Sequence, residues 1–337
     1  MNTENARILV IGAGVNGSIC ATGLHQAGID VTLLARGTRY EEIRDGGVVI
    51  ENPFKNTRSV SRVPVINCLD PQDVYEYVLV VVRKNQVADL LPVLARNQSP
   101  NIVFMVNNPS GPGEFCNALG KERVMLGFVF GAGKRDGGVI RAMAGVGTAS
   151  SLAGLLWPSP FGEIDGAITP RLTRLVGILR RAGFAAGISR NVTDYLATHA
   201  ALVAPMAGFL MQRGYDRLSL ARNTRDDFGL LVDALREVLD VLPAVGVRVT
   251  PPSTAVLKII PRFLLVAWFR VLLPTKFMEV GALYHVSQAP DEMRQLGIEL
   301  MALVARSGLP VPAIRKLCSD PSVSSHQVEL GQLDTRA

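Results

Sequence analysis

Residues 7–17 read Arg-Ile-Leu-Val-Ile-Gly-Ala-Gly-Val-Asn-Gly, an apolar run that ends in three closely spaced glycines. In a G-x-G-x-x-G pattern the first glycine (Gly12) makes a tight turn, the second (Gly14) leaves room for a pyrophosphate, and the third (Gly17) lets a helix approach the strand. The pattern is weak evidence by itself in a chain with 32 glycines. A strand before it and a helix after it nevertheless favour a dinucleotide site. The residues predicted to form this part of the site are Gly12, Gly14, Val15, Asn16 and Gly17.

The next segment indicates which dinucleotide is bound. The periodicity predicts a helix over Val15–Ala27 and a second strand over Asp30–Ala35. An acid at the tip of this strand would bind a free ribose 2′-hydroxyl, whereas an arginine would pair with a 2′-phosphate. The tip carries Arg36, with Arg39 as a second candidate and no acid before Glu41. We therefore predict NADP(H); the alternative for Arg36 is an ordinary solvated side chain at a strand end.

Further apolar segments extend this unit into a larger sheet. Strands that are apolar at every position belong to the middle of a parallel sheet covered on both faces. The fold class expected for residues 1–190 is α/β, a Rossmann-type doubly wound parallel sheet. Its further predicted strands are Tyr77–Val82, Asn101–Val106, Arg123–Val129, Gly138–Arg141 and Phe184–Ser189, with helices at Asn85–Arg96 and Pro170–Ala182 and an irregular hairpin-like stretch at Gly47–Val65.

The second half of the chain lacks strand patterns and is predicted to form an all-α C-terminal domain over residues 191–318. Proline and glycine separate its helical segments. The remaining residues, 319–337, are polar without periodicity, and we expect a loose tail. The predicted helices are Asn191–Met211, Arg225–Leu242, Thr254–Leu272, Lys276–Val286 and Pro290–Ser307.

Composition narrows the class of protein. The four cysteines show neither metal-ligand nor disulfide spacing: Cys20, Cys68, Cys116 and Cys318. No metal site is therefore expected, and we interpret the cysteines as reduced thiols of a cytoplasmic protein. The first seven residues lack the layout of a signal peptide. The net charge of +6 is spread along the chain, which favours an anionic small molecule over nucleic acid. Charged residues and Pro261 interrupt the apolar run 255–273, so no membrane span is expected.

Several motifs resemble the ketopantoate reductase family over nearly the whole chain up to Cys318. One strand ends V-V-V-R-K-N-Q-V with Arg83 and Gln86, and another ends M-V-N-N-P-S-G, where Asn108 would stand beside the nicotinamide with Asn107 as its neighbour. The resemblance implies an NADP-dependent reductase that acts on CH–OH groups. It also implies that Arg83, Gln86 and Asn108 contact the cofactor.

The chain departs from this family at the residue that carries the substrate chemistry. The family has a lysine and asparagines in a W-x-K-x-x-x-N pattern on the first long C-terminal helix. Aligning Tyr195 with the tryptophan puts Ala197 where the lysine belongs. His199 lies on the same helix, but two residues correspond to about 200° of rotation, so it does not share the lysine's face. A proton donor and a buried structural histidine are both open readings of His199.

Other candidate proton donors lie further along the predicted C-terminal domain. Lys276 precedes Glu279 by one turn, and Glu279 resembles the family's late cofactor-contacting glutamate. A surface Lys–Glu pair on a helix explains the same spacing. His285 and Glu292 are equally ambiguous, because Glu292 also fits the acidic start of a helix. The predicted catalytic residues are His199, Lys276 and Asn108; the cofactor residues outside the glycine turn are Arg36, Arg83, Gln86, Asn108 and Glu279.

Three functions are consistent with these residues. The leading one is reduction of a small 2-oxo acid, ketone or related carbonyl by NADPH, with a changed proton donor implying a changed substrate. An imine or opine-type reductase is the second, because an iminium needs less general acid. The third is a non-catalytic protein that binds NADPH. The apolar segment Phe263–Leu273 further suggests a homodimer contact.

Overall fold

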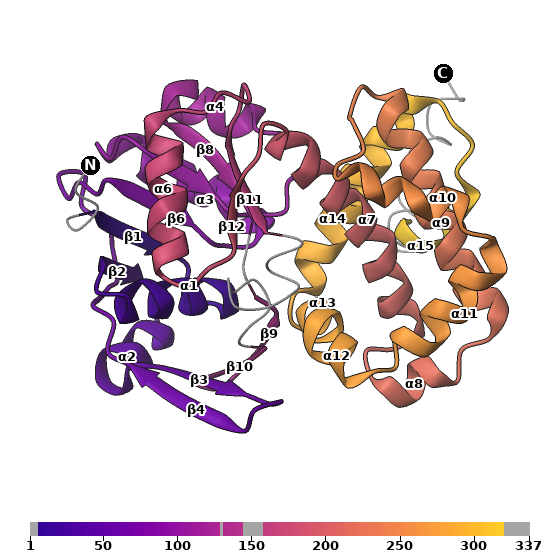
Figure 1. Cartoon of the computed structure of the whole chain (residues 1–337), viewed down its shortest axis with the longest axis horizontal. Coiled ribbons are helices and arrows are strands. Elements are labelled where there is room, and N and C mark those ends of the chain that lie inside the picture. Colours follow the sequence, from indigo (N-terminus) through magenta and orange to yellow (C-terminus); the bar gives the residue numbers. More distant parts are fainter. Residues whose placement is uncertain (1–5, 129–130, 144–157, 320–337) are drawn as a thin grey trace, which may run out of the picture.

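The computed structural model describes residues 6–128, 131–143 and 158–319. These residues form two lobes side by side, a sheet domain and a helical domain, as Figure 1 shows. The main sheet ends with strand β12 (Ala186–Ile188), and helix α7 (Val192–Arg213) begins the helical domain. The predicted tail, apart from Ser319, lies outside the described residues.

The main sheet has eight strands in the order β12-β11-β8-β7-β6-β1-β2-β5. Strands β7, β6, β1 and β2 pair in parallel with their neighbours, so their carboxyl ends meet at one edge. This arrangement confirms the predicted Rossmann-type domain. The strand bounds are β1 Arg7–Ile11, β2 Asp30–Leu34, β5 Val65–Ile66, β6 Tyr77–Val80, β7 Ile102–Phe104, β8 Val124–Gly127 and β11 Ser159–Glu163.

Helices cover both faces of this sheet. Alternate residues of β1 enter two different cores, Ile8 on one face and Leu9 on the other, and both are fully buried. Because neither face of the strand meets water, its sequence is apolar at every position. Helices α1 (Val15–Gln26) and α6 (Pro170–Arg181) cover one face, and α3 (Val87–Arg96) and α4 (Gly113–Leu119) cover the other.

The sheet is not parallel throughout, which corrects the predicted arrangement. β11 runs antiparallel to β8, with Phe161 opposite Gly127. The sequence Ser-Pro-Phe-Gly-Glu of β11 hid this strand, because Pro160 cannot donate to a ladder and Gly162 weakens strand propensity. The segment predicted over Arg123–Val129 ends as a strand at Gly127, and Val129 lies outside the described residues.

A second, four-stranded sheet lies below the main one in Figure 1, in the order β4-β3-β10-β9. The predicted strand at Gly138–Arg141 forms β10 of this small sheet and is not part of the main sheet. The predicted hairpin supplies β3 and β4, while helix α2 (Thr38–Gly46) connects it to β2. The bounds are β3 Val48–Asn52, β4 Thr57–Ser61, β9 Gly133–Asp136 and β10 Val139–Ala142.

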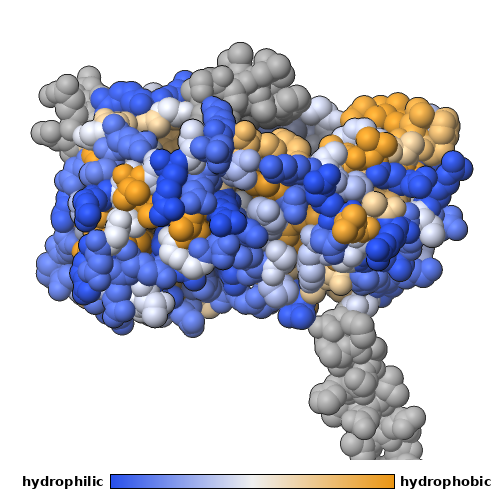
Figure 2. Space-filling model, turned by 90° about the horizontal axis from the view of Figure 1, so that it is seen from below, coloured by the Kyte–Doolittle hydropathy of each residue, from blue (hydrophilic) through white to orange (hydrophobic). Residues whose placement is uncertain are grey.

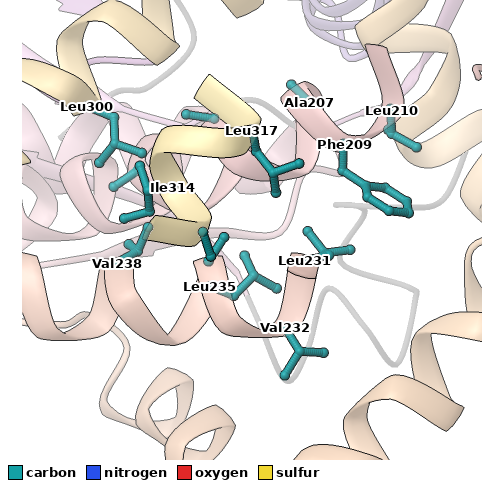
Figure 3. Close-up of a cluster of buried hydrophobic side chains, with 14 of the residues drawn as sticks. Ala207, Phe209, Leu210, Leu231, Val232, Leu235, Val238, Leu300, Ile314 and Leu317 are labelled. Atoms are coloured by element: carbon teal, nitrogen blue, oxygen red, sulfur yellow. The ribbon is translucent and has the colours of Figure 1, made fainter. Parts of the chain in front are cut away.

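The described part of the helical domain contains no strand, as predicted. Its core joins α7, α9 (Arg225–Ala244), α14 (Pro290–Ser307) and α15 (Pro312–Cys318). Figure 3 shows Ile314 and Leu317 of α15 beside Leu235 and Val238 of α9. The sequence patterns did not reveal α15 or the short α8 (Arg217–Ala221), each less than eight residues long.

Two predicted helices are interrupted. The segment 254–272 divides into η3 (Pro252–Ala255), α10 (Val256–Ile259) and α11 (Arg262–Leu272), because Pro261 lacks the N–H that a continuous helix needs. The segment 276–286 comprises α12 (Lys276–Met278), the π-helical turn η4 (Glu279–Leu283) and α13 (Tyr284–Gln288). None of the helices in the described ranges has both the length and the hydropathy needed to cross a membrane.

Candidate active site

The glycine turn between β1 and α1 has the geometry that its pattern predicts. Gly12 has φ of +109°, and a Cβ there would stand 2.2 Å from the carbonyl oxygen of Val81. A Cβ on Gly17 would stand 1.7 Å from the carbonyl oxygen of Gly12. A Cβ on Gly14, in contrast, would meet no atom within 4 Å. Two of the glycines are therefore required by packing, while the third leaves an open approach of the kind that a pyrophosphate needs.

Asn16 connects this turn to a distant part of the sheet domain. Its side-chain oxygen accepts a hydrogen bond of 3.0 Å from the backbone N–H of Gly131, in the segment after β8. Val15 and Asn16 are both half-buried at the start of α1. Asn16 thus fixes the beginning of the helix whose N-terminal amides face the predicted phosphate position.

The tip of β2 presents one arginine for a 2′-phosphate. The backbone N–H of Gly12 bonds the carbonyl of Leu34 at 3.2 Å, so the glycine turn and the tip lie side by side. Arg36 is exposed at this tip, and it has no hydrogen bond or ion pair with any described residue. An exposed, unengaged guanidinium here fits a phosphate ligand.

Arg39 has a different role from the predicted one. Its side chain is buried, its Nε donates to the carbonyl of Ala13 at 3.1 Å, and its Nη1 donates to the carbonyl of Gly138 at 2.9 Å. A further bond of 3.0 Å joins Nη1 to Glu42, and burial lowers the pKa of Arg39. These contacts tie the glycine turn to the small sheet, and they leave Arg39 unavailable to a cofactor phosphate.

The end of β6 meets the helical domain through a series of polar contacts. Arg83 donates to the carbonyl of Gln288 and lies 3.7 Å from the carboxylate of Asp291. Gln86 is exposed, and its side-chain oxygen accepts a bond of 3.2 Å from the backbone N–H of Arg83. Lys84 is buried and pairs with Glu114 at 2.9 Å. Arg83 and Gln86 therefore lie at the strand edge that carries the glycine turn, at the junction of the two domains.

The two asparagines after β7 occupy different environments. Asn108 is 1% exposed, and its Oδ1 has no hydrogen-bond partner. Asn107 is half-buried, and its Nδ2 donates to Oε1 of Glu292 at 3.2 Å. Asn107 is thus the residue that reaches across the domain junction, although the sequence predicted the functional contact for its neighbour Asn108.

His199 lies within an aromatic cluster. Its ring centroid is 4.5 Å from that of Phe128 and 6.4 Å from that of Tyr195, with nearly parallel planes in the second pair. Desolvation by these surroundings, together with the charge of His285, lowers the pKa of His199 to about 4. At neutral pH the imidazole is therefore uncharged, which is a poor state for a proton donor.

His285 on α13 and Glu292 on α14 face one another. Their nearest atoms, Nε2 of His285 and Oε2 of Glu292, are 3.9 Å apart. The Glu292 side chain is 3% exposed, whereas that of His285 is 43% exposed. The charge effect of His285 on His199 places all three groups in one region, next to Asn107.

Lys276 and Glu279 make their contacts with other residues than His199, His285 and Glu292. Lys276 is exposed, its Nζ donates to the carbonyl of Pro53 at 3.3 Å, and it stands 5.4 Å from the ring centroid of Phe54, in the β3–β4 hairpin. Glu279 is half-buried and raises the pKa of Tyr284 by its charge, after the larger effect of desolvation. The structure does not bring either residue into contact with His199 or Asn108.

Sequence reasoning had no signal that joined Asn107 with Glu292, because the two residues are 185 positions apart. Glu292 had an adequate local explanation as an acidic residue in the first turn of α14. An acidic residue near a helix start points to a functional site only when it is known to be buried, and the sequence alone does not give its burial. Among the described residues no cluster of three or more His, Cys, Asp or Glu side chains could hold a metal ion.

The sequence of the N-terminal part matches a known family. Residues 8–150 match the model of the family described as ketopantoate reductase PanE/ApbA. This stretch contains the glycine turn, the tip of β2 and the ends of β6 and β7. No curated protein sequence matches the chain significantly.

Solved structures with the same fold cover almost the whole chain. A D-mandelate dehydrogenase bound to NADH and anilino(oxo)acetate has a TM-score of 0.72 at 14% identity, covering 96% of this chain and 99% of the other. The 2-dehydropantoate 2-reductase from Methylococcus capsulatus has a TM-score of 0.69 at 19% identity, covering 98% of each chain. A dimeric ketopantoate reductase from Staphylococcus aureus has a TM-score of 0.66 at 13% identity, covering 96% of this chain and 99% of the other.

Proposed function

We propose, on the premise that residues 8–150 belong to the ketopantoate reductase family, that this chain is an NAD(P)H-dependent reductase of a small 2-oxo acid, ketone or related carbonyl. The observation that carries the proposal is the open face of Gly14, at the same strand edge as Asn107 and its partner Glu292. Ligands of doubly wound sheets bind outside the carboxyl ends of the strands. A nicotinamide cofactor bound here supplies the hydride for carbonyl reduction.

NADP(H) is the cofactor that the β2 tip favours. Arg36 is exposed and unengaged by described residues, and a guanidinium pairs well with a phosphate. Only one arginine supports this preference, because Arg39 is bonded to Ala13 and Gly138. We therefore expect a preference for NADPH over NADH that depends on Arg36 alone.

The acceptor is expected to differ from ketopantoate. When Tyr195 is aligned with the family's tryptophan, Ala197, 3% exposed on α7, falls where the lysine is expected. Lys84 does not replace it, because its ammonium group pairs with Glu114. The D-mandelate dehydrogenase that shares the fold was solved with a 2-oxo acid, anilino(oxo)acetate, which makes aryl-substituted 2-oxo acids suitable first candidates.

The missing lysine also keeps a second function open. An iminium acceptor is already polarised and needs less general acid, so an imine or opine-type reductase suits the same site. A protein that binds NADPH without catalysis is the remaining alternative. Each of the three has a different signature in one assay.

That assay measures oxidation of NADPH and NADH with a panel of 2-oxo acids and ketones, first alone and then with added amines. Turnover with the oxo acid alone supports carbonyl reduction, whereas turnover that requires an amine supports the imine reductase. Saturable NADPH binding without turnover on any member of the panel would identify a binding protein.

The chain is further proposed to be a cytoplasmic homodimer. All four cysteines are free in the structure, as expected in a reducing compartment. Figure 2 shows hydrophobic residues gathered at the helical-domain end of the molecule. Helix α11 exposes Phe263, Leu264, Trp268 and Val271, with Val271 76% exposed. An apolar face of this kind is typical of a subunit contact, and the Staphylococcus aureus protein with this fold is dimeric.

A further inference from the structure

Glu292 is a buried carboxylate with only one of its oxygens engaged. Oε1 accepts from Nδ2 of Asn107 at 3.2 Å and from the backbone N–H of Lys84 at 3.5 Å. Oε2 is buried and has no hydrogen-bond partner among the described residues. Leaving a carboxylate oxygen without a partner in a low-dielectric environment is strongly unfavourable. Such an oxygen indicates that a hydrogen-bond donor or a cation pairs with it when the site is occupied.

The group that faces Oε2 is the imidazole of His285. Its Nε2 lies 3.9 Å from Oε2, within ion-pair range but too far for a hydrogen bond, so the pair must draw closer to form one. Catalytic hydrogen bonds are often long before substrate binds. The carboxylate then holds the Nε2–H of the imidazole, so Nδ1 is the nitrogen left for a substrate.

Of the two histidines at the junction, His285 is the better placed to exchange protons with a substrate and with water. Its side chain is 43% exposed, whereas His199 is half-buried, packs against the rings of Phe128 and Tyr195 and is neutral at pH 7. An imidazole that is neutral at pH 7 is a poor proton donor, because it must first be protonated before it can deliver a proton to a substrate and recover one from water. The exposed imidazole can do both.

We infer that His285 is the proton donor of the proposed reduction and that Glu292 is its positioning residue. The inference rests on the proposed function. The carbonyl carbon of the substrate accepts a hydride, and the C=O π-electron pair moves to the oxygen. The oxygen takes the proton from Nδ1 of the His285 imidazolium, which becomes a neutral imidazole and is reprotonated by water. The product is the 2-hydroxy acid.

Charged groups on the neighbouring elements define the field around His285. Helix α13 packs against η4, β9, α7 and α14, and Glu279 of η4 acts by its charge on Tyr284, the neighbour of His285. From these elements Glu292 and His199 face His285, while Lys134 lies over the ring of Tyr284 at 4.5 Å. Glu292 is thus a carboxylate within ion-pair range of His285, and we expect its removal to change the state of the imidazole.

The kinetic test compares H285Q, E292Q and H199Q with H25Q, a change of the remote histidine on α1. In H285Q we expect kcat to fall by about 100-fold or more, the range for a general acid, with NADPH affinity unchanged. The decline of kcat with rising pH, which reports a protonated donor, should disappear in H285Q and persist in H199Q and H25Q. If H285Q keeps both its kcat within about threefold and that decline, His285 is not the donor, although the reductase function stands.

A second measurement does not require turnover. In ¹⁵N spectra of the imidazoles with cofactor bound, we expect His285 to hold its proton on Nε2 when neutral and to shift on addition of oxamate, an unreactive 2-oxo acid analogue. E292Q should abolish the fixed tautomer, whereas a purely structural Glu292 would leave it unchanged. If no wild-type turnover occurs on any carbonyl, the proposed function fails and this assignment fails with it.

Discussion

Asn107 after strand β7 donates a hydrogen bond of 3.2 Å to Glu292 in the first turn of α14, and this bond joins the two domains at a buried carboxylate. A second amide, Asn85, makes a similar bond of 3.1 Å across the same junction to Asp291, but both of those side chains are exposed. The junction therefore contains two chemically matched contacts that differ mainly in burial.

N107A is expected to lower the free energy of unfolding by about 1–3 kcal/mol, because it leaves the Glu292 carboxylate with a single long bond. N85A removes an exposed partner and is expected to cost less than about 1 kcal/mol. Urea unfolding of the two variants at neutral pH measures the difference. Equal effects would mean that burial of Glu292 does not determine the strength of the contact.

G14A and G17A separate packing from cofactor binding. A methyl group on Gly14 meets no protein atom within 4 Å, so we expect G14A to fold normally and to lose cofactor affinity by at least about tenfold. A methyl group on Gly17 collides with the carbonyl of Gly12, so G17A should lose stability itself, by about 1–3 kcal/mol. Thermal unfolding and fluorescence titration with NADPH measure both effects. Full affinity in G14A would contradict a pyrophosphate at this turn.

R36A is expected to weaken NADPH binding by about 10–100-fold and to leave NADH binding nearly unchanged, because a charge-assisted bond to the 2′-phosphate contributes roughly 1.5–3 kcal/mol. The control is R44A, since Arg44 is an exposed arginine on α2 whose contacts are local, with its neighbour Asp45 and with the ring of Tyr40. Isothermal titration with each cofactor gives the two affinities. A parallel loss of both would show that Arg36 does not read the 2′-phosphate.

His199 is expected to make folding stability depend on pH. Its pKa is about 4 in the folded chain and roughly 6.5 when unfolded, so the unfolded state binds more protons between these values. Stability therefore falls as the pH falls through this window, by about 2 kcal/mol between pH 7.5 and pH 5. H199F should lack this part of the dependence, and H25Q should keep it, in urea unfolding at the two pH values.

W268D is expected to prevent dimer formation, because a carboxylate would have to be buried in the apolar face of α11. Light scattering coupled to gel filtration measures the oligomeric state. I298D is the matched control: Ile298 is also exposed, at 56%, but it lies on α14 outside that face. A monomeric wild-type chain, or a dimer in both variants, would remove α11 from the contact.

Local sequence was sufficient for the parts of the fold with local causes. The strand–turn–helix from Arg7 to Gln26 follows from an apolar run and three glycines, and it was predicted almost to the residue. Strand β11 was missed because Pro160 and Gly162 disguise it, and the break at Pro261 was overlooked in an apolar segment. In β11 pairing with distant residues overrides the local pattern, whereas the break at Pro261 has the local cause that proline lacks a backbone N–H.

The candidate site shows the same division. Arg36 and the glycine turn are recognisable from spacing alone. Arg39 was assigned to a phosphate because it follows Arg36, yet its partner Gly138 is 99 positions away. The pairing of His285 with Glu292 likewise depends on how α13 turns into α14, which no period in the sequence specifies.

The bonds of Arg39 have a consequence for the order of folding. They join Ala13 to Gly138, and Gly138 is held in place by β10, which pairs in parallel with β3 some 90 positions earlier in the chain. Contacts between residues so far apart form slowly, because loop closure precedes their gain. The glycine turn is thus expected to receive its last supporting bonds after the small sheet has assembled. During refolding, the capacity to bind the dinucleotide is expected to arise later than the main sheet itself.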